Sequence, residues 1–293
     1  MISLTRAEGS RPEDFNLSRR GLAGAVFFSG YAVYALAADA EPIHTDEAGL
    51  IIETVMLPSP DRELPAYLAR PSAAGKYPTV IVASEIFGVH DYIKDICRRL
   101  AKLGFVALAP AFFVRVGDPA PLADFGAIMR IVAAASDKQV IGDVGAAIKF
   151  LKAQSYADTS HLGITGFCWG GKVVWESCEI FPEIKAGVAW YGHMAPGVSE
   201  APNPAKFWPL QHVAELKAPV LGLYGGLDKG ITADEVAAMR AELKVHGKTG
   251  SQLIVYPDAQ HGFHADYRDS YNAAAAKDGW AKMLAHFKAN GVG

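Results

Sequence analysis

One cysteine stands in a setting that could make it a nucleophile. Cys168 lies in the run G-F-C-W-G-G, residues 166–171, where an apolar stretch meets a helical pattern. A nucleophile on a sharp strand-to-helix turn needs small neighbours two positions before and after it. Gly166 and Gly170 meet that demand. The thiol would then project above the carboxyl ends of the strands, near a helix N-terminus whose dipole favours the thiolate.

The other two cysteines, Cys97 and Cys178, fit the ordinary role of small buried hydrophobic side chains. Three scattered cysteines make neither a disulfide framework nor the paired Cys/His spacing of a zinc site. Cys168 also lacks the nearby second cysteine of a C-x-x-C redox motif. The sequence predicts no metal and no organic cofactor.

A nucleophilic thiol needs a base, and the base needs an acid that orients it. Asp228 falls in the loop after a predicted strand at residues 220–224, and His261 falls in the loop after a predicted strand at 252–256. Both loops would lie at the carboxyl edge of the sheet. The chain order nucleophile, acid, histidine is typical of folds that carry the nucleophile on a sharp strand-to-helix turn, called the nucleophile elbow. We therefore predict a triad of Cys168, Asp228 and His261.

Other residues compete for these roles. Asp258 is a second acid in a suitable loop, and Asp228 could instead cap the helix that begins near Thr232. Three further histidines fall at the same edge, where we expect pocket walls or hydrogen-bonded groups: His90, His193 and His264.

An oxyanion hole requires two converging backbone N–H groups. One is expected from Trp169, directly after the nucleophile, and the other from the loop at residues 84–88, which follows a predicted strand at 79–83. Ile86 is the expected donor in that loop.

The elements that would position these residues alternate between short apolar runs and helical periodicity. That alternation predicts an α/β fold with a mostly parallel central sheet and helices on both faces. Two opening strands, at 50–56 and 64–69, are expected to pair antiparallel, and residues 111–135 are expected to be an irregular excursion over the site. The remaining predicted strands are 79–83, 105–109, 162–166, 187–191, 220–224 and 252–256, and the predicted helices are 92–103, 138–153, 170–180, 232–245 and 270–289.

Residues 1–40 differ in composition from the rest. Arg19 and Arg20 precede an uncharged apolar run over residues 21–38, which ends at small-residue sites of the A-x-A type. This order indicates a secretory signal peptide, and the paired arginines favour the twin-arginine route, although Leu22 stands where Phe is usual. We expect a periplasmic or secreted protein with a single domain over 41–293; without cleavage, the segment would be a membrane anchor.

Composition narrows the range of partners. The chain has 293 residues, a formal net charge of -3 and no basic stripe, so neither nucleic acid nor an anionic membrane is an expected partner. Any membrane contact would come only through an uncleaved signal segment. The expected partner is a small molecule, and no particular oligomeric state is predicted.

The elbow and its partners resemble the dienelactone hydrolase family (carboxymethylenebutenolidases) of α/β-hydrolases, over about residues 50–290. By this resemblance, Glu85 matches a glutamate that contacts the resting nucleophile, and Arg115 matches the arginine that pairs with it after substrate binds. Tyr191 falls at a matching pocket position. The family's substrate-gripping arginine, four residues after the histidine, is replaced here by Ala265, and Arg268 is the nearby substitute.

The resemblance implies a hydrolase that cleaves a small ester or lactone through a cysteine acyl-enzyme. Thiolate attack on the carbonyl would give the acyl-enzyme, and water assisted by His261 would release the acid. The change at Ala265 favours a more general ester or lactone over dienelactone itself. The alternatives are an α/β-hydrolase-fold binding protein that has lost the chemistry, and a hydrolase or acyltransferase of another specificity.

Overall fold

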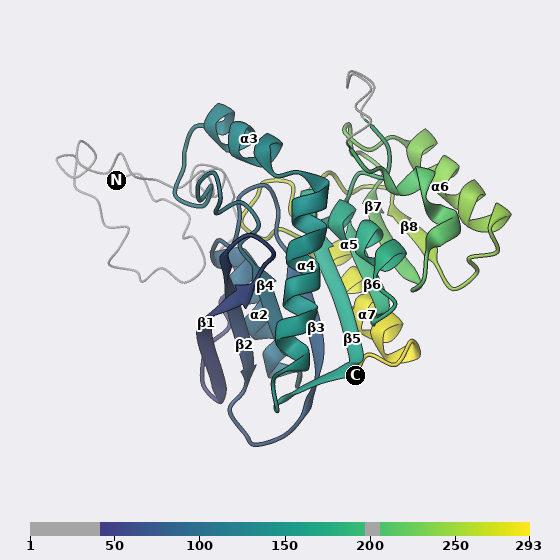
Figure 1. Cartoon of the computed structure of the whole chain (residues 1–293). Coiled ribbons are helices and arrows are strands. Elements are labelled where there is room, and N and C mark those ends of the chain that lie inside the picture. Colours follow the sequence, from purple (N-terminus) through teal and green to yellow (C-terminus); the bar gives the residue numbers. More distant parts are fainter. Residues whose placement is uncertain (1–41, 197–205) are drawn as a thin grey trace.

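The computed structural model describes residues 42–196 and 206–293, whose strands form one eight-stranded sheet (Figure 1). The strand order is β1-β2-β4-β3-β5-β6-β7-β8. The first two strands pair antiparallel, β2 also pairs antiparallel with β4, and all later pairs are parallel. The strands are β1 (Leu50–Pro58), β2 (Glu63–Pro71), β3 (Tyr77–Ala83), β4 (Val106–Pro110), β5 (Ala157–Phe167), β6 (Ile184–Trp190), β7 (Val220–Gly225) and β8 (Gln252–Tyr256).

Helices cover both faces of this sheet. In Figure 1, α4 and α5 cross the near face, whereas α2 and α7 lie behind the strands. The central strands are therefore buried on both sides, which explains their continuous apolar sequences. The helices are α2 (Asp91–Lys102), α3 (Phe125–Ala134), α4 (Asp137–Lys152), α5 (Trp169–Ile180), α6 (Ala233–Val245) and α7 (Ala273–Ala289). The predicted α/β-hydrolase architecture, with its antiparallel opening pair, is confirmed.

The prediction of an irregular segment at 111–135 was wrong in its second half. Residues Phe125–Ala134 form α3, whose first turn is capped by the Asp124 carboxylate. Ile128 and Val132 of this helix are buried against Phe87, next to the loop after β3. The glycine and prolines at 117–121 obscured a helical pattern that begins only after them.

The signal-peptide prediction concerns residues 1–40, which lie outside the described part of the chain. Within the residues described, no helix combines the length and the hydrophobicity needed to cross a bilayer.

Helix α5, which follows the predicted nucleophile, contains a buried acid. The Glu179 side chain is 1% exposed, and within the described residues its two carboxylate oxygens have no hydrogen-bond partner. Burial, with the nearby charges of Glu176 and Glu215, raises the pKa of Glu179 to about 9. The folded state therefore holds a proton that the unfolded chain releases near pH 4.5.

Removing this acid should change how stability depends on pH. Because the pKa of Glu179 is raised in the folded state, its ionisation costs stability as pH rises from the unfolded pKa towards about 9. Glu179→Gln should raise the melting temperature by several degrees at pH 8.5 and by much less at pH 5. The control is Glu183→Gln, since Glu183 pairs with Lys152 at 2.9 Å and its pKa is lowered. Equal melting shifts at both pH values would contradict this account.

Candidate functional site

The turn that carries Cys168 adopts a backbone conformation that L-residues rarely accept. Cys168 has φ 55° and ψ -117° between β5 and α5. A Cβ added at Gly166 would lie 2.3 Å from the Gly170 carbonyl oxygen, and one at Gly170 would lie 2.3 Å from the Ala83 carbonyl oxygen. Strain of this kind typically costs about 1–3 kcal/mol and persists only where surrounding packing enforces it. The two glycines are therefore required by close packing against β3, as the sequence pattern predicted.

The three residues of the predicted triad lie in one hydrogen-bonded line. His261 Nε2 is 3.2 Å from Cys168 Sγ, and His261 Nδ1 is 2.7 Å from Asp228 Oδ2. The other Asp228 oxygen accepts the backbone N–H groups of Gly230 at 2.8 Å and Ile231 at 3.1 Å. Asp228 is thus fixed by its own loop, and it holds the imidazole with Nε2 towards the sulfur.

The surroundings of His261 favour its charged form. Burial alone lowers its pKa, but the negative charge of a Cys168 thiolate and the hydrogen bond to Asp228 outweigh that effect and raise the pKa to about 10. Burial likewise raises the pKa of Asp228, yet the hydrogen bond and charge of His261 bring it below the usual value. The surroundings of His261 therefore favour an imidazolium whose Nε2 faces the Cys168 sulfur.

The aromatic ring of Tyr191 packs edge-on against the His261 ring, with centroids 5.1 Å apart. Tyr191 is fully buried and has a positive φ of 40°. It lies directly after β6, at the edge where β5 ends. Its contact with the imidazole supports the orientation that Asp228 sets.

The competing residues lie elsewhere. The Asp258 residue is exposed, and the His264 ring is buried with Nδ1 2.6 Å from the Tyr92 hydroxyl. Burial lowers the pKa of His264, which suits a neutral structural histidine. His193 is 3.8 Å from Glu235 on α6.

The two other thiols are fully buried in the main core. Burial raises the pKa of both Cys97 and Cys178 above the ordinary value. Neither thiol is therefore placed to act as a nucleophile.

The two expected oxyanion donors lie at the start of α5 and in the loop after β3. Trp169 is the first residue of α5, so its N–H points out of the helix N-terminus, and Ile86 lies in the loop that follows β3. Within the described residues, neither N–H donates to a protein carbonyl. Both side chains pack on the small apolar cluster that also contains Phe87 and Phe113.

Glu85 is buried beside this loop, but its partners differ from those expected. Its carboxylate accepts the Tyr267 hydroxyl at 2.6 Å and lies 3.3 Å from His90 Nε2. Arg268 Nη1 is 3.7 Å from the other Glu85 oxygen. Burial would raise the pKa of Glu85, and these three partners together lower it below the ordinary value. In this structure the glutamate is held as a buried anion, and Cys168 Sγ contacts His261 instead.

Arg115, which the resemblance pairs with Glu85 after substrate binds, lies with other partners in this structure. Arg115 forms short ion pairs with Asp61 at 2.5 Å and with the buried Asp143 at 2.8 Å. A guanidinium committed to two carboxylates is not free to approach Glu85. Arg268, which the sequence offered only as a nearby substitute, is the cation beside Glu85.

Tyr267 was missed by sequence reasoning. Its ring is fully buried and its hydroxyl is bound to Glu85, although the two residues are 182 positions apart. The available signal was its place directly before Arg268, in the loop after His261. The sequence position of a loop tyrosine does not predict which distant carboxylate accepts a hydrogen bond from its hydroxyl.

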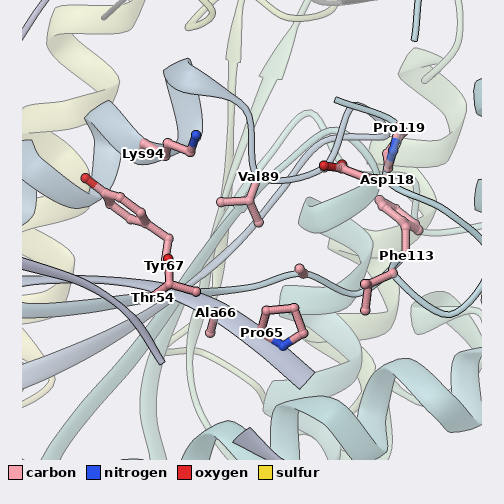
Figure 2. Close-up of a pocket in the computed structure, with 12 residues that line it drawn as sticks. Thr54, Pro65, Ala66, Tyr67, Val89, Lys94, Phe113, Asp118 and Pro119 are labelled. Atoms are coloured by element: carbon pink, nitrogen blue, oxygen red, sulfur yellow. The ribbon is translucent and has the colours of Figure 1, made fainter. Parts of the chain in front are cut away.

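A cavity of about 250 Å³ lies near the oxyanion loop but outside the triad. Figure 2 shows Lys94 and Asp118 on opposite sides of it, above mostly apolar walls. Phe113 lines this cavity, and its ring is 4.7 Å from the ring of Trp169. None of the three triad residues lines it, so the cavity and the nucleophile are separate features.

Known proteins similar to this chain share its architecture and much of its sequence. The dienelactone hydrolase family model matches residues 64–291. A Methylorubrum extorquens protein named "Putative carboxymethylenebutenolidase" is 46% identical over 278 residues, 94% of each chain. A Bradyrhizobium protein named "Probable 2-oxo-3-(5-oxofuran-2-ylidene)propanoate lactonase" is 34% identical over 223 residues, 76% of this chain and 88% of its own.

A solved structure agrees with these matches. A crystal structure described as a "Putative Dienelactone Hydrolase" from Klebsiella pneumoniae has 42% sequence identity and a TM-score of 0.77. It covers 82% of this chain and 98% of its own. Sequence, family model and fold therefore agree: this chain belongs to the dienelactone hydrolase family and is an ester or lactone hydrolase.

Proposed function

We propose that the enzyme cleaves small esters or lactones through an acyl-enzyme on Cys168. The observation that carries the proposal is the hydrogen-bonded line from Cys168 Sγ through His261 to Asp228, at 3.2 and 2.7 Å. A thiolate paired with an imidazolium is a nucleophile that needs no further activation.

Acylation begins with attack of the thiolate on the substrate carbonyl carbon. The carbonyl oxygen becomes an oxyanion, which the N–H groups of Trp169 and Ile86 would stabilise. As the tetrahedral intermediate collapses, the carbon–oxygen ester bond breaks. His261 Nε2 gives its proton to the leaving alkoxide, which departs as an alcohol or, in a lactone, stays attached as a hydroxyl group.

Deacylation follows from the change of charge at sulfur. In the acyl-enzyme the sulfur is a neutral thioester, so the strongest influence that raises the pKa of His261 disappears. Burial, which lowers that pKa, then favours the neutral imidazole. Neutral His261 takes a proton from water, the hydroxide attacks the thioester carbonyl, and the acid leaves as the thiolate–imidazolium pair is restored.

The position of Arg268 favours a substrate that carries a negative charge near the scissile bond. Its side chain is 20% exposed and lies 3.7 Å from Glu85, beside the oxyanion loop. A substrate carboxylate could replace Glu85 as the partner of this guanidinium. The name of the Bradyrhizobium relative describes a lactone with a carboxylate, which supports the same class. We propose anionic lactones and short esters as the substrate class.

Export is part of the proposal. Paired arginines, an apolar run and small-residue sites within residues 1–40 support a periplasmic or secreted enzyme that crosses the membrane already folded. Folding before export would shield the reactive thiol until its surroundings are complete.

The nucleophile is tested with p-nitrophenyl acetate. The wild-type enzyme should release a burst of p-nitrophenol equal to the amount of enzyme, and mass spectrometry should find the acetyl group on Cys168. Cys168→Ala should abolish the burst and lower kcat by roughly 10³-fold or more. Cys97→Ala is the control, because that thiol is buried and should leave both measurements unchanged. An acyl group on another residue, or binding without turnover, would contradict the proposal.

The charge-dependent role of His261 is tested by NMR titration of its ring. In the free enzyme the imidazolium should persist up to about pH 10, because the raised pKa belongs to the folded state with a thiolate beside it. Alkylating Cys168 with iodoacetamide leaves a neutral thioether, so the pKa of His261 should fall by more than one unit. His286, whose pKa burial lowers, serves as an internal reference that should not respond. An unchanged His261 titration would refute the mechanism.

Arg268 and Arg115 provide a matched pair for substrate recognition. Arg268→Met should raise KM for an anionic lactone by about 10–100-fold, since a charge-assisted hydrogen bond contributes about 1.5–3 kcal/mol. For an uncharged ester the change in KM should be much smaller. Arg115→Met should lower the melting temperature by breaking its pairs with Asp61 and Asp143, but leave KM for both substrates unaltered. A KM effect in Arg115→Met would restore the original interpretation of that residue.

A further inference from the structure

The loop that carries the base is pinned by an ion pair outside the triad. Asp266 lies five residues after His261, and its side chain is 1% exposed. Arg99 of α2 donates to this carboxylate, with Nη2 2.6 Å from Oδ2. A buried carboxylate needs such a partner, because desolvation of an unpaired charge is costly. The pair ties the middle of the loop to α2, a helix that carries none of the triad residues.

Arg99 is itself fixed by a second buried acid on the same helix. Its Nε is 2.5 Å from Asp95 Oδ2, and Asp95 is fully buried. Arg98 Nη2 donates to the other Asp95 oxygen at 2.8 Å. The four charges alternate in sign and sum to zero. Helix α2 in turn packs on β2 and β4, so this ladder is anchored to the sheet.

The first described residues of the chain complete the ladder. The Thr45 backbone N–H donates to Asp95 at 2.7 Å, and its hydroxyl does so at 3.2 Å. Arg98 Nε returns a hydrogen bond to the Thr45 carbonyl at 2.9 Å. Burial raises the pKa of Asp266 to about 6, and the charge of Arg99 and the backbone N–H of Ile43 both oppose that rise. Signal cleavage near Ala38 or Glu41 would leave this arm intact.

Two functional parts of the site depend on the pinned loop. His261 stands at its start, in hydrogen-bonding distance of Cys168. Tyr267, directly after Asp266, holds Glu85 through its hydroxyl. Glu85 precedes Ile86, the expected oxyanion donor. A shift of Asp266 would therefore disturb the base and the oxyanion loop together.

We propose that Arg99 is a positioning residue of this enzyme, acting through its ion pair with Asp266, and that the arm at residues 43–45 completes the anchor. The inference rests on the proposed cysteine mechanism and adds to it a support that lies outside the triad. Displacements of about 1 Å by remote mutations can cost on the order of 10²-fold in rate.

Arg99→Met, Arg99→Lys and Arg115→Met form the test set. Arg115 is the matched control, because its side chain is 13% exposed against 15% for Arg99 and it also pairs with two carboxylates. For a small uncharged ester, Arg99→Met should lower kcat at least about tenfold with KM within about threefold, and Arg99→Lys should recover most of the loss. Arg115→Met should melt earlier by a similar amount without a comparable fall in kcat. Equal kcat values in Arg99→Met and Arg115→Met would overturn the proposal.

The rate of Cys168 alkylation by iodoacetamide separates this proposal from the proposed function. Alkylation depends on the thiolate–imidazolium geometry and needs no ester substrate. Arg99→Met should slow it, whereas Arg115→Met should not. If the wild type is alkylated rapidly but forms no acyl-enzyme, the proposed function fails and the comparison of alkylation rates still decides the role of Arg99.

Thr45→Pro tests the arm, because it removes both donors to Asp95. It should lower kcat and the alkylation rate in the same direction as Arg99→Met, by a smaller factor. Wild-type rates for both reactions would remove the arm from the proposal.

Discussion

The contact between Cys168 Sγ and His261 Nε2 depends on a backbone conformation that the rest of the structure must enforce. At φ 55° and ψ -117° the turn is strained, and it is held because Gly166 and Gly170 let β3, β5 and α5 approach more closely than a side chain would allow. The same turn places the sulfur beside a helix N-terminus and towards the carboxyl edge of the sheet. The raised pKa of His261 follows from the short distance between its ring and that sulfur.

In the proposed mechanism, the burial of His261 has a different effect in each half of the reaction. In the free enzyme of this proposal, the charges of Cys168 and Asp228 outweigh the burial of His261, so the imidazolium would donate a proton to the leaving group. Once sulfur is acylated, its charge is gone and burial favours the neutral base. One histidine can thus act first as an acid and then as a base without moving. The switch lies in the charge of its neighbour.

The parts of the site that obey local rules could be predicted from the sequence. The elbow needs two glycines at fixed spacing, and the acid and histidine fall in loops after parallel strands, whose carboxyl ends meet at one edge. The partners of Glu85 obey no such rule. Tyr267 reaches it across 182 positions, and Arg115 is drawn to Asp61 and Asp143 instead. Helix α3 was missed because glycine and prolines precede it. Its buried face carries Ile128 and Val132.

Buried charges connect these long-range parts. Burying Glu85, Asp95 or Asp266 as an unpaired carboxylate would destabilise the fold. Each is instead bound by cations or hydroxyl donors. Such pairs are weak evidence for stability, because apolar residues of similar shape often stabilise a core as well. The position of these pairs beside one loop is better explained by the geometry they impose, since a hydrogen-bonded ion pair tolerates less displacement than apolar packing. A catalytic loop that must present both a base and an oxyanion support gains from that restriction.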